Sequence, residues 1–182
     1  MSDITYSKDE LNLASLPHQL FLSNSIGNHV LLTVITVSIA MTYPLLTLLI
    51  PTVSAAIIIF TLVRGSKLKN HQSALVRCHW QIAMRRTRIF LIGYAVLATA
   101  AGLAWLLFAY GGAMKELVFA LVGGLGLLPF MVMVLALTIM ESESLNHAGE
   151  GFIPDWARRR FGTEEEVKVL EEELAANAAA DA

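Results

Sequence analysis

The stretch NHVLLTVITVSIAMTYPLLTLLIPTVSAAIIIFTLV, residues 28–63, contains no Lys, Arg, Asp or Glu. Two further apolar stretches without these residues follow, at 89–114 and 117–140. Such stretches are typical of membrane-spanning helices, each of which needs about 20 residues. The first stretch has 36 residues. It is therefore too long for one straight span and predicts two helices joined by a tight turn.

The turn is predicted at Thr42-Tyr43-Pro44, because proline starts helices well and disfavours helix in the residue before it. The predicted fold class is all-α. We expect a polytopic membrane protein with four transmembrane helices arranged as two antiparallel hairpins, together with cytoplasmic amphipathic helices. The four spans are predicted at about residues 23–43, 45–63, 89–110 and 117–140.

Composition supports a membrane protein and excludes several other classes. Of the 182 residues, 55% are hydrophobic and only 15% are charged, whereas soluble proteins carry about a quarter charged residues. The net charge of −2 gives no global basicity that would indicate nucleic-acid binding. The single cysteine, Cys78, excludes an intramolecular disulfide. The first twenty residues lack the basic start and the cleavage site of a signal peptide.

The distribution of basic residues predicts the orientation. With four spans, both termini and the segment 64–88 lie on the same side of the membrane. That side carries 12 of the 13 basic residues, and only Lys115 lies on the other. Because short cytoplasmic loops are enriched in Lys and Arg, we expect a multi-pass protein of the bacterial inner (plasma) membrane with both termini in the cytoplasm.

Three parts follow from this topology. Residues 1–22 form an N-terminal cytoplasmic or interfacial segment, in which a short helix is expected to break near Pro17. Residues 23–140 form the transmembrane domain, including the basic cytoplasmic loop 64–88. Residues 141–182 form an acidic cytoplasmic tail that holds 11 of the 15 acidic residues. A capping-box pattern at Thr163 predicts a short final helix in this tail.

The basic loop has the clearest functional content. Residues 71–88 are predicted to form a helix with Leu75, Cys78, His79 and Ile82 on one face. Basic side chains beside a membrane attract anionic head groups, so we expect a surface that docks a partner or lipids; the alternative is that these residues only set the topology. The predicted docking residues are Arg77, Trp80, Arg85, Arg86 and Arg88, with Trp156, Arg158, Arg159 and Arg160 in the tail.

Small residues mark the expected helix contacts inside the membrane, since they let helix backbones approach closely. They are Ala98 and Gly102 on the third predicted span, and Gly123, Gly124 and Gly126 on the fourth. The alternative is that the glycines line a groove for a lipid or a small solute.

Few residues suggest chemistry. No ionisable residue lies in the middle of a predicted span, which argues against an ion- or proton-coupled transporter. His29, His79 and His147 are expected near one depth, so haem b held between helices is a hypothesis; the alternative is that they are ordinary interfacial histidines. The spacing of Cys78 and the histidines lacks the paired ligands of a zinc site. There is no G-x-S-x-G motif, and we predict no catalytic residue, no metal and no enzyme activity.

Part of the sequence resembles a known family. The second span ends in Ile58-Ile59-Phe60…Arg64, and Cys78-His79-Trp80-Gln81-Ile82…Arg86-Thr87 runs into the third. This pattern, over about residues 45–140, resembles an uncharacterised family of small four-helix bacterial membrane proteins that is distantly similar to a component of the chloroplast inner-envelope import machinery. The family histidine usually stands three places before the tryptophan, where this chain has Arg77, and Ala83-Met84-Arg85 looks like an insertion.

These features lead to a functional hypothesis. Small size, closely packing spans, polar segments on one side and the lack of a catalytic constellation favour a non-catalytic accessory or scaffold subunit of a larger inner-membrane complex. Its expected partners are other integral membrane subunits and anionic lipids, with no nucleic acid and no cofactor. The alternatives are a redox subunit carrying b-type haem, and a membrane protein that handles lipids or small solutes.

Overall fold

A computed structural model describes residues 6–39, 42–112 and 114–180 of the chain. Within these ranges all regular structure is helical and no strand occurs, which confirms the predicted all-α class. The chain divides into two compact units. The first unit comprises Met1–Met84 and Glu141–Ala182, and the second comprises Arg85–Met140.

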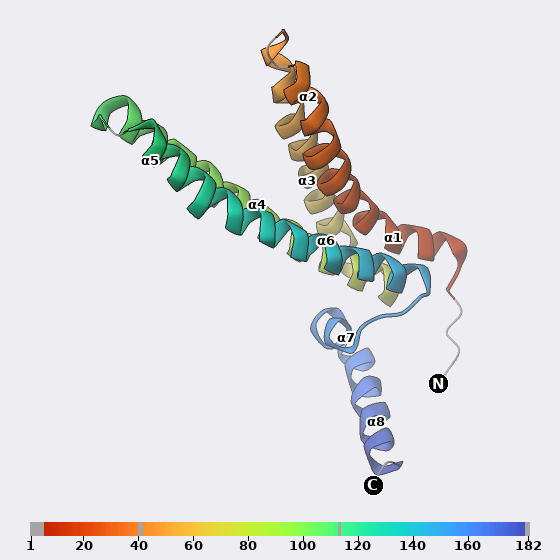
Figure 1. Cartoon of the computed structure of the whole chain (residues 1–182). Helices are drawn as coiled ribbons and strands as arrows, with labels where there is room; N and C mark the ends of the chain where they lie inside the picture. The colour runs from red at the N-terminus through yellow and green to blue at the C-terminus, as the bar shows by residue number, and fades with distance from the viewer. Residues whose placement is uncertain (1–5, 40–41, 113, 181–182) are drawn as a thin grey trace. The chain divides into compact units, whose positions relative to one another are not determined.

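The first unit contains a helical hairpin and a group of helices that we call the head (Figure 1). The head consists of α1, residues 68–84 and residues 141–180. In chain order the elements of the unit are α1 (Lys8–Leu22), the π-helical η1 (Ser23–Leu32), α2 (Thr33–Ile39), the 3-10 helix η2 (Pro44–Leu48), α3 (Leu49–Lys67), the 3-10 helix η3 (Leu68–Asn70), the start of α4 (Ala74–Gly111), the end of α6 (Leu128–Gly149), α7 (Asp155–Phe161) and α8 (Glu164–Ala180).

Helix α1 runs through Pro17 without interruption, so the predicted break is wrong. A proline inside a helix lacks the N–H that would bond the carbonyl four residues earlier, here that of Leu13. In this protein the indole Nε1 of Trp80 donates to the Leu13 carbonyl oxygen at 2.8 Å. A side chain from α4 thus replaces the missing backbone donor, and the helix continues.

The hairpin of the first unit turns where the sequence predicts. Helix α2 ends at Ile39, a turn includes Thr42, and η2 begins at Pro44. Residues 40–41, which belong to the first predicted span, lie outside the described residues.

Polar side chains connect the two arms of this hairpin. Asn24 Nδ2 donates to Ser54 Oγ at 3.1 Å, and Asn28 Nδ2 donates to the carbonyl of Ile50 at 2.9 Å. A ring nitrogen of His29 lies 3.0 Å from the same Ser54 hydroxyl. Hydrogen bonds of this kind hold helices together in lipid, where apolar surfaces alone give little preference for a partner.

The second unit is also a hairpin. It contains α4 from residue 85 onward, α5 (Lys115–Ala120), the π-helical η4 (Leu121–Leu127) and α6 up to residue 140. Its arms, α4 and α6, lie side by side (Figure 1). Gly126 sits so close to α4 that an added Cβ would meet Leu97 at 3.1 Å, and Gly93 faces the side chain of Met133 in the same way. The connection passes through Gly112, whose φ of 66° suits glycine.

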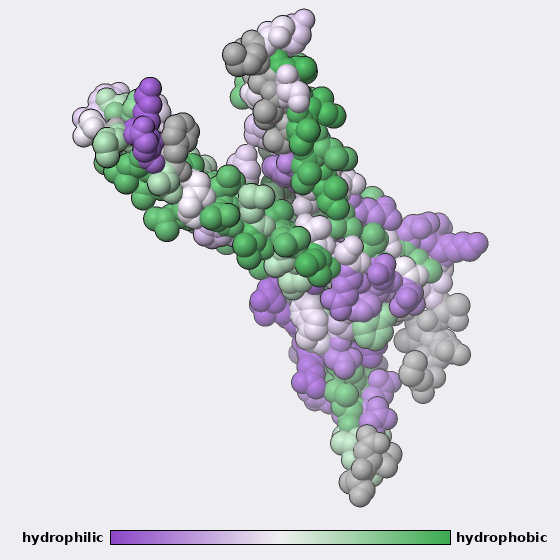
Figure 2. Space-filling model, in the orientation of Figure 1, coloured by the Kyte–Doolittle hydropathy of each residue, from purple (hydrophilic) through white to green (hydrophobic). Residues whose placement is uncertain are grey.

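Three helices of the described chain are long and apolar enough to cross a membrane. They are Leu45–Asn70, Ala74–Gly111 and Lys115–Glu150, and the most apolar 18 residues of each have mean hydropathies of 2.4, 2.0 and 2.5. Hydrophobic residues predominate along both hairpins on the face shown in Figure 2. The predicted helix at 71–88 and the predicted span at 89–110 form one helix, α4, of 38 residues. At 1.5 Å per residue α4 is about 57 Å long, well beyond the ~30 Å thickness of a bilayer core.

Candidate functional site

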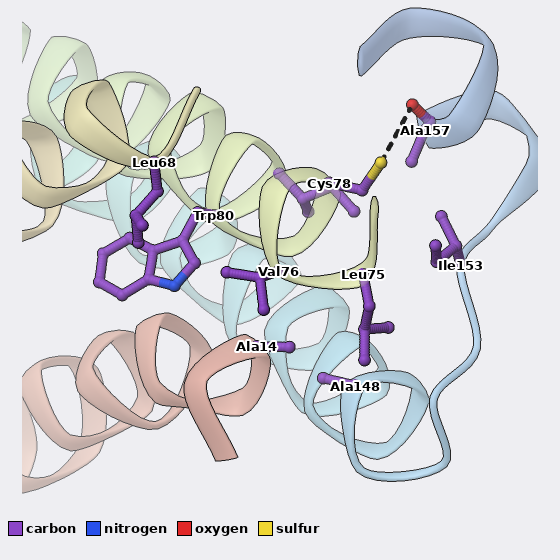
Figure 3. Packing of buried hydrophobic residues seen from close by; sticks show 10 residues of the cluster. Ala14, Leu68, Leu75, Val76, Cys78, Trp80, Ala148, Ile153 and Ala157 are labelled. Carbon is purple, nitrogen blue, oxygen red and sulfur yellow. Dashed lines mark hydrogen bonds between the residues drawn. The ribbon is translucent and has the colours of Figure 1, made fainter. Parts of the chain in front are cut away.

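The head has its own hydrophobic core (Figure 3). Its members come from α1, η3, α4, α6, α7 and the loop before α7: Ala14, Leu68, Leu75, Val76, Cys78, Trp80, Ile82, Ala148, Ile153 and Ala157. The acidic tail is therefore packed against the rest of the head rather than exposed along its whole length, since Ile153 and Ala157 are buried in this core. The face of α4 that the sequence predicts to be apolar supplies three of the core's side chains, Leu75, Cys78 and Ile82. His79, on the same face, is a fully buried polar group beside them.

A fully buried polar chain crosses the head. A carboxylate oxygen of Glu141, on α6, pairs with Nδ1 of His18, on α1. Nε2 of His18 lies 2.9 Å from Nδ1 of His79, on α4. Nε2 of His79 lies 3.0 Å from the carbonyl oxygen of Phe152. Side chains from three helices and a loop carbonyl thus form one continuous row, with Glu141, His18 and His79 all at 0% exposure.

The geometry fixes the number of protons in this row. A carbonyl only accepts, so His79 must carry its proton on Nε2, which leaves Nδ1 of a neutral His79 as an acceptor. His18 then donates from Nε2, and one further proton lies between His18 Nδ1 and Glu141. These hydrogen bonds explain how a carboxyl group and two imidazoles tolerate complete burial.

Gly151 places the carbonyl that ends the row. It adopts φ 72° two residues after the end of α6, and the following Phe152 N–H donates to the carbonyl of His147 at 2.8 Å. A Cβ on Gly151 would also lie 2.9 Å from the ring of Tyr6. Only glycine fits both the backbone conformation and the space.

We expect Gly151→Ala to destabilise the head by about 1–2 kcal/mol, the cost of a left-handed conformation for a residue with a Cβ, with the Tyr6 contact adding to it. Gly149→Ala is the matched control, because Gly149 is helical and has no atom within 4 Å of the new Cβ. Thermal unfolding of both variants in nanodiscs tests this expectation. Equal midpoints for the two variants would show that Gly151 is not required.

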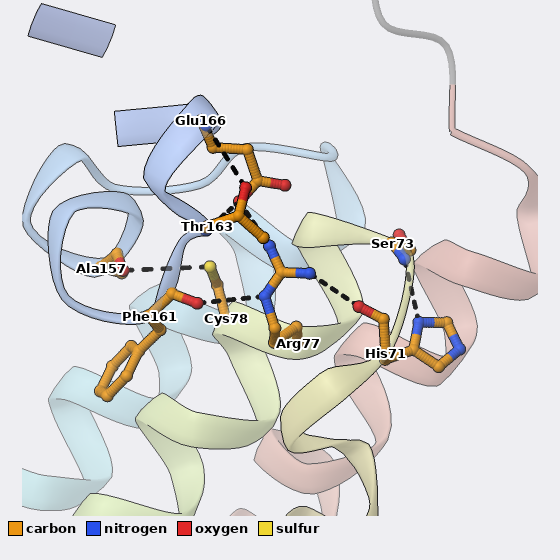
Figure 4. A network of polar contacts seen from close by, with 8 residues as sticks. All are labelled: His71, Ser73, Arg77, Cys78, Ala157, Phe161, Thr163 and Glu166. Carbon is orange, nitrogen blue, oxygen red and sulfur yellow. Dashed lines mark hydrogen bonds and ion pairs between the residues drawn. The ribbon is translucent and has the colours of Figure 1, made fainter. Parts of the chain in front are cut away.

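A second polar network attaches the tail to α4 (Figure 4). Arg77 Nε donates to the carbonyl of Phe161 at 3.0 Å, Nη1 donates to the carbonyl of His71 at 2.7 Å, and Nη2 pairs with Glu166. Glu166 also accepts the backbone N–H of Thr163 at 2.8 Å, and the Thr163 hydroxyl accepts the N–H of Glu166. This is the predicted capping box, and α8 begins at the next residue.

Partial burial of Glu166 opposes its ionisation, but the hydrogen bonds from Arg77 and from the Thr163 backbone outweigh it and lower the pKa of the Glu166 carboxyl below its ordinary value of 4.5. A carboxyl whose pKa is lower in the folded state stabilises that state above its unfolded pKa. The contribution is therefore complete at neutral pH and is lost as pH falls below 4.5 through the folded pKa. Because the pair is partly exposed, we expect less than about 1 kcal/mol.

Removing this carboxylate should make the stability of the protein depend less on pH in the acid range. We expect the midpoint of urea unfolding to fall less between pH 6 and about pH 3.5 for Glu166→Gln than for the unmodified chain. Glu165→Gln, the exposed neighbour, is the control and should keep the original slope. A Glu166→Gln slope that matches the control would refute the assigned role.

Cys78 provides a reporter of head opening. Its side chain is fully buried, and its Sγ lies 3.9 Å from the carbonyl of Ala157. Burial raises the pKa of the Cys78 thiol to about 11, so the group is a protonated thiol at neutral pH. Since the thiolate is the reactive form, modification should require the head to open.

Three of the predicted docking residues have structural roles instead. Arg77 and Trp80 are buried in the head by the contacts given above, and Arg86 is buried in the second unit with Nη1 2.8 Å from the carbonyl of Met140. Arg158 pairs with Glu173 at 3.6 Å. The remaining members, which stay predicted docking residues, are exposed: Arg85, Arg88, Trp156, Arg159 and Arg160.

The structure does not hold the three candidate haem ligands as a set. His29 contacts Ser54 in the hairpin, and His79 has both ring nitrogens in the buried row. The ring of His147 packs edge-on against Phe152, with centroids 4.8 Å apart. A haem iron would have to displace these hydrogen bonds. Over the described residues no group of three His, Cys, Asp or Glu side chains is arranged to hold a metal ion.

Sequence reasoning missed His18 and Glu141. They lie 123 positions apart, and no local motif joins them. The available signal was positional: Glu141 is the first charged residue after the last apolar stretch, and His18 lies just before the first. Both residues therefore lie near the predicted membrane boundary, as does the predicted helix 71–88 that carries His79.

The small residues divide into two sets. Gly126 is in close contact with α4, as described above. Around Gly102, Gly123 and Gly124 an added Cβ would meet nothing within 4 Å, and Ala98 is exposed. These four residues are uncovered within their hairpin.

Comparisons of the chain with protein-family models, with curated proteins and with solved structures give no match. The resemblance to the small bacterial membrane family therefore stays a prediction. The structure itself shows that the described chain is all-helical and has three helices long and apolar enough to cross a membrane.

Proposed function

We propose that this protein is a non-catalytic accessory subunit of a bacterial inner-membrane complex. Two transmembrane hairpins, four spans in total, would anchor it, and the head would lie in the cytoplasm. The observation that carries this proposal is how little of its apolar helix surface the chain covers by itself. In the three candidate spans only 17%, 11% and 6% of the most apolar windows are buried within the protein.

The hairpin arms support four spans. The arm formed by η1 and α2 is not one of the three candidate spans. Its side chains nevertheless resemble theirs, since Val30, Leu31, Val34 and Ile35 are all more than half exposed. Bonds from Asn24 and Asn28 fix this arm to α3, so the proposal places both arms in the same apolar layer. The termini and the segment 64–88 hold 12 of the 13 basic residues. Because short cytoplasmic loops are enriched in Lys and Arg, this distribution supports a cytoplasmic head.

The uncovered small residues favour a protein partner over lipid alone. Lipid tails fill the space around a large side chain as well as around a small one, whereas a second helix gains close backbone contact only at small residues. Gly102, Gly123 and Gly124 provide such positions on the second hairpin. The exposed Arg159 and Arg160, with the acidic face of α8, provide charged surface on the head for the soluble part of a partner.

The test is purification of the full chain through a C-terminal tag in nanodiscs formed directly from membranes, with quantitative mass spectrometry and an absorption spectrum. We expect a stoichiometric membrane partner that Gly124→Leu reduces strongly. Leu125→Phe adds bulk at a neighbouring position that is already exposed, and it should leave the partner in place. A chain that purifies alone would refute the proposal and favour lipid or solute handling. A Soret band would instead identify a haem protein.

A further inference from the structure

The head contains a cavity of about 490 Å³ that is separate from the buried row. Its walls are η3 with the loop after it, the first turns of α4, and the link between α7 and α8. Figure 4 shows several of the side chains that line it, including Arg77 and Phe161. The volume lies within the range of natural small-molecule sites, about 300–1,000 Å³.

The lining is positively charged, although the whole chain has a net charge of −2. Lys69, Arg77 and Arg160 contribute three positive charges and Glu166 contributes one negative charge, which leaves two positive charges in excess. Glu166 is already paired with Arg77. Lys69 and Arg160 are exposed, and no ion pair engages either of them among the described residues.

The polar groups around this excess charge include hydrogen-bond donors. The side-chain amides of Asn70 and Gln72 line the same cavity, and each has two N–H donors. The guanidinium of Arg160 lies over the ring of Phe161, 5.9 Å from its centroid, which positions the cation at the cavity wall. Guanidinium and ammonium groups with amide donors are the groups that bind phosphate oxygens. The acidic Glu164 and Glu165 lie between the cavity residues Thr163 and Glu166 in sequence but do not line the cavity.

We propose that this cavity binds the phosphate group of a small anionic ligand, with Lys69 and Arg160 as the cations that hold it. The ligand would join η3 to the end of α7, because Lys69 lies on the first and Arg160 on the second. Phosphate binding would thus tighten the attachment of the tail that Arg77 and Glu166 already provide.

The ligand is assigned as a free phosphorylated solute, because the cavity has the volume of a small-molecule site. A lipid head group offers the same phosphate chemistry, and the second arm of the test distinguishes the two sources.

Binding of inorganic pyrophosphate to the full chain tests the site. Calorimetric titration is carried out at constant ionic strength in nanodiscs of phosphatidylcholine, which carries no net charge. We expect saturable binding that Lys69→Gln and Arg160→Gln each weaken about tenfold, the size of one lost charge-assisted hydrogen bond. Lys67→Gln and Arg159→Gln are the matched controls, since both residues are exposed neighbours that do not line the cavity, and they should bind as the unmodified chain does.

A second arm distinguishes the two sources of phosphate. Nanodiscs that contain phosphatidic acid are compared with pure phosphatidylcholine by thermal unfolding, without pyrophosphate. A rise in Tm that Lys69→Gln and Arg160→Gln abolish, without pyrophosphate binding, would overturn the assignment to a free solute. No binding in either arm, or equal weakening by the control variants, would overturn the site itself. Circular dichroism of all four variants checks that any loss of binding is not caused by a loss of helical structure.

Discussion

Replacing Glu141 with Ala should destabilise the head by about 3 kcal/mol. The change removes one partner from a fully buried row and leaves His18 Nδ1 without the group it faces. Loss of a partner costs about 1–3 kcal/mol for a neutral buried hydrogen bond and about 3–5 kcal/mol for a buried ion pair. The measurement is the urea midpoint for modification of Cys78 in nanodiscs, which reports opening of the head because that thiol is buried in its core.

Two further variants sharpen this test. Glu143→Ala removes an exposed carboxylate two residues along the same helix and should leave the midpoint unchanged. Glu141→Gln retains the shape of the side chain and offers an N–H to His18. A small effect of Glu141→Gln would indicate that the proton of the row lies on Glu141, whereas an effect as large as that of Ala would place it on His18. If Glu141→Ala behaves like Glu143→Ala, the row does not hold the head together.

The helices of this protein were predictable because each depends on local sequence. Long runs without charge mark the membrane-length helices, and the pattern of Thr163 and Glu166 marks the start of α8. The turn before Pro44 follows from the conformational limits of proline and of the residue preceding it. These signals act within a few residues, so one sequence suffices to identify them.

The buried row was not predictable for the opposite reason. His18, His79 and Glu141 belong to three helices and meet only when the head folds. A polar residue at the edge of an apolar stretch has the same appearance whether it faces water, lipid head groups or another helix. Trp80 illustrates this ambiguity: beside basic residues it was predicted to dock a partner or lipids, but it is fully buried.

The head also explains why the tail belongs to the same unit as the N-terminus. Glu141 contacts α1, Phe152 contacts α4 through its carbonyl, and Glu166 contacts Arg77. Hydrogen bonds thus attach the tail to the rest of the head at three successive points. A partner that binds the exposed face of α8 would therefore bind a surface held by the fold, and removing the tail from residue 150 onward would open the core as well as remove the surface.

The pairing of Trp80 with the carbonyl of Leu13 gives the other large expected effect. Trp80→Ala should destabilise the head by about 3–5 kcal/mol, as is usual when a buried aromatic side chain is lost. Trp80→Phe keeps most of the ring but removes the N–H, and it should cost about 1–3 kcal/mol because Pro17 leaves Leu13 without a backbone donor. Trp156→Phe, at an exposed tryptophan, is the control and should have little effect.

A double-mutant cycle with Pro17→Ala isolates this hydrogen bond. Alanine at position 17 restores a backbone N–H that can reach the Leu13 carbonyl, so the carbonyl stays paired when the indole is lost. Trp80→Phe should therefore cost at least about 1 kcal/mol less in the Pro17→Ala background than in the original chain, as measured by the Cys78 midpoint. Equal costs in both backgrounds would mean that the helix tolerates Pro17 for some other reason. A reduced cost would establish that α1 depends on a tryptophan 67 positions away to remain one helix.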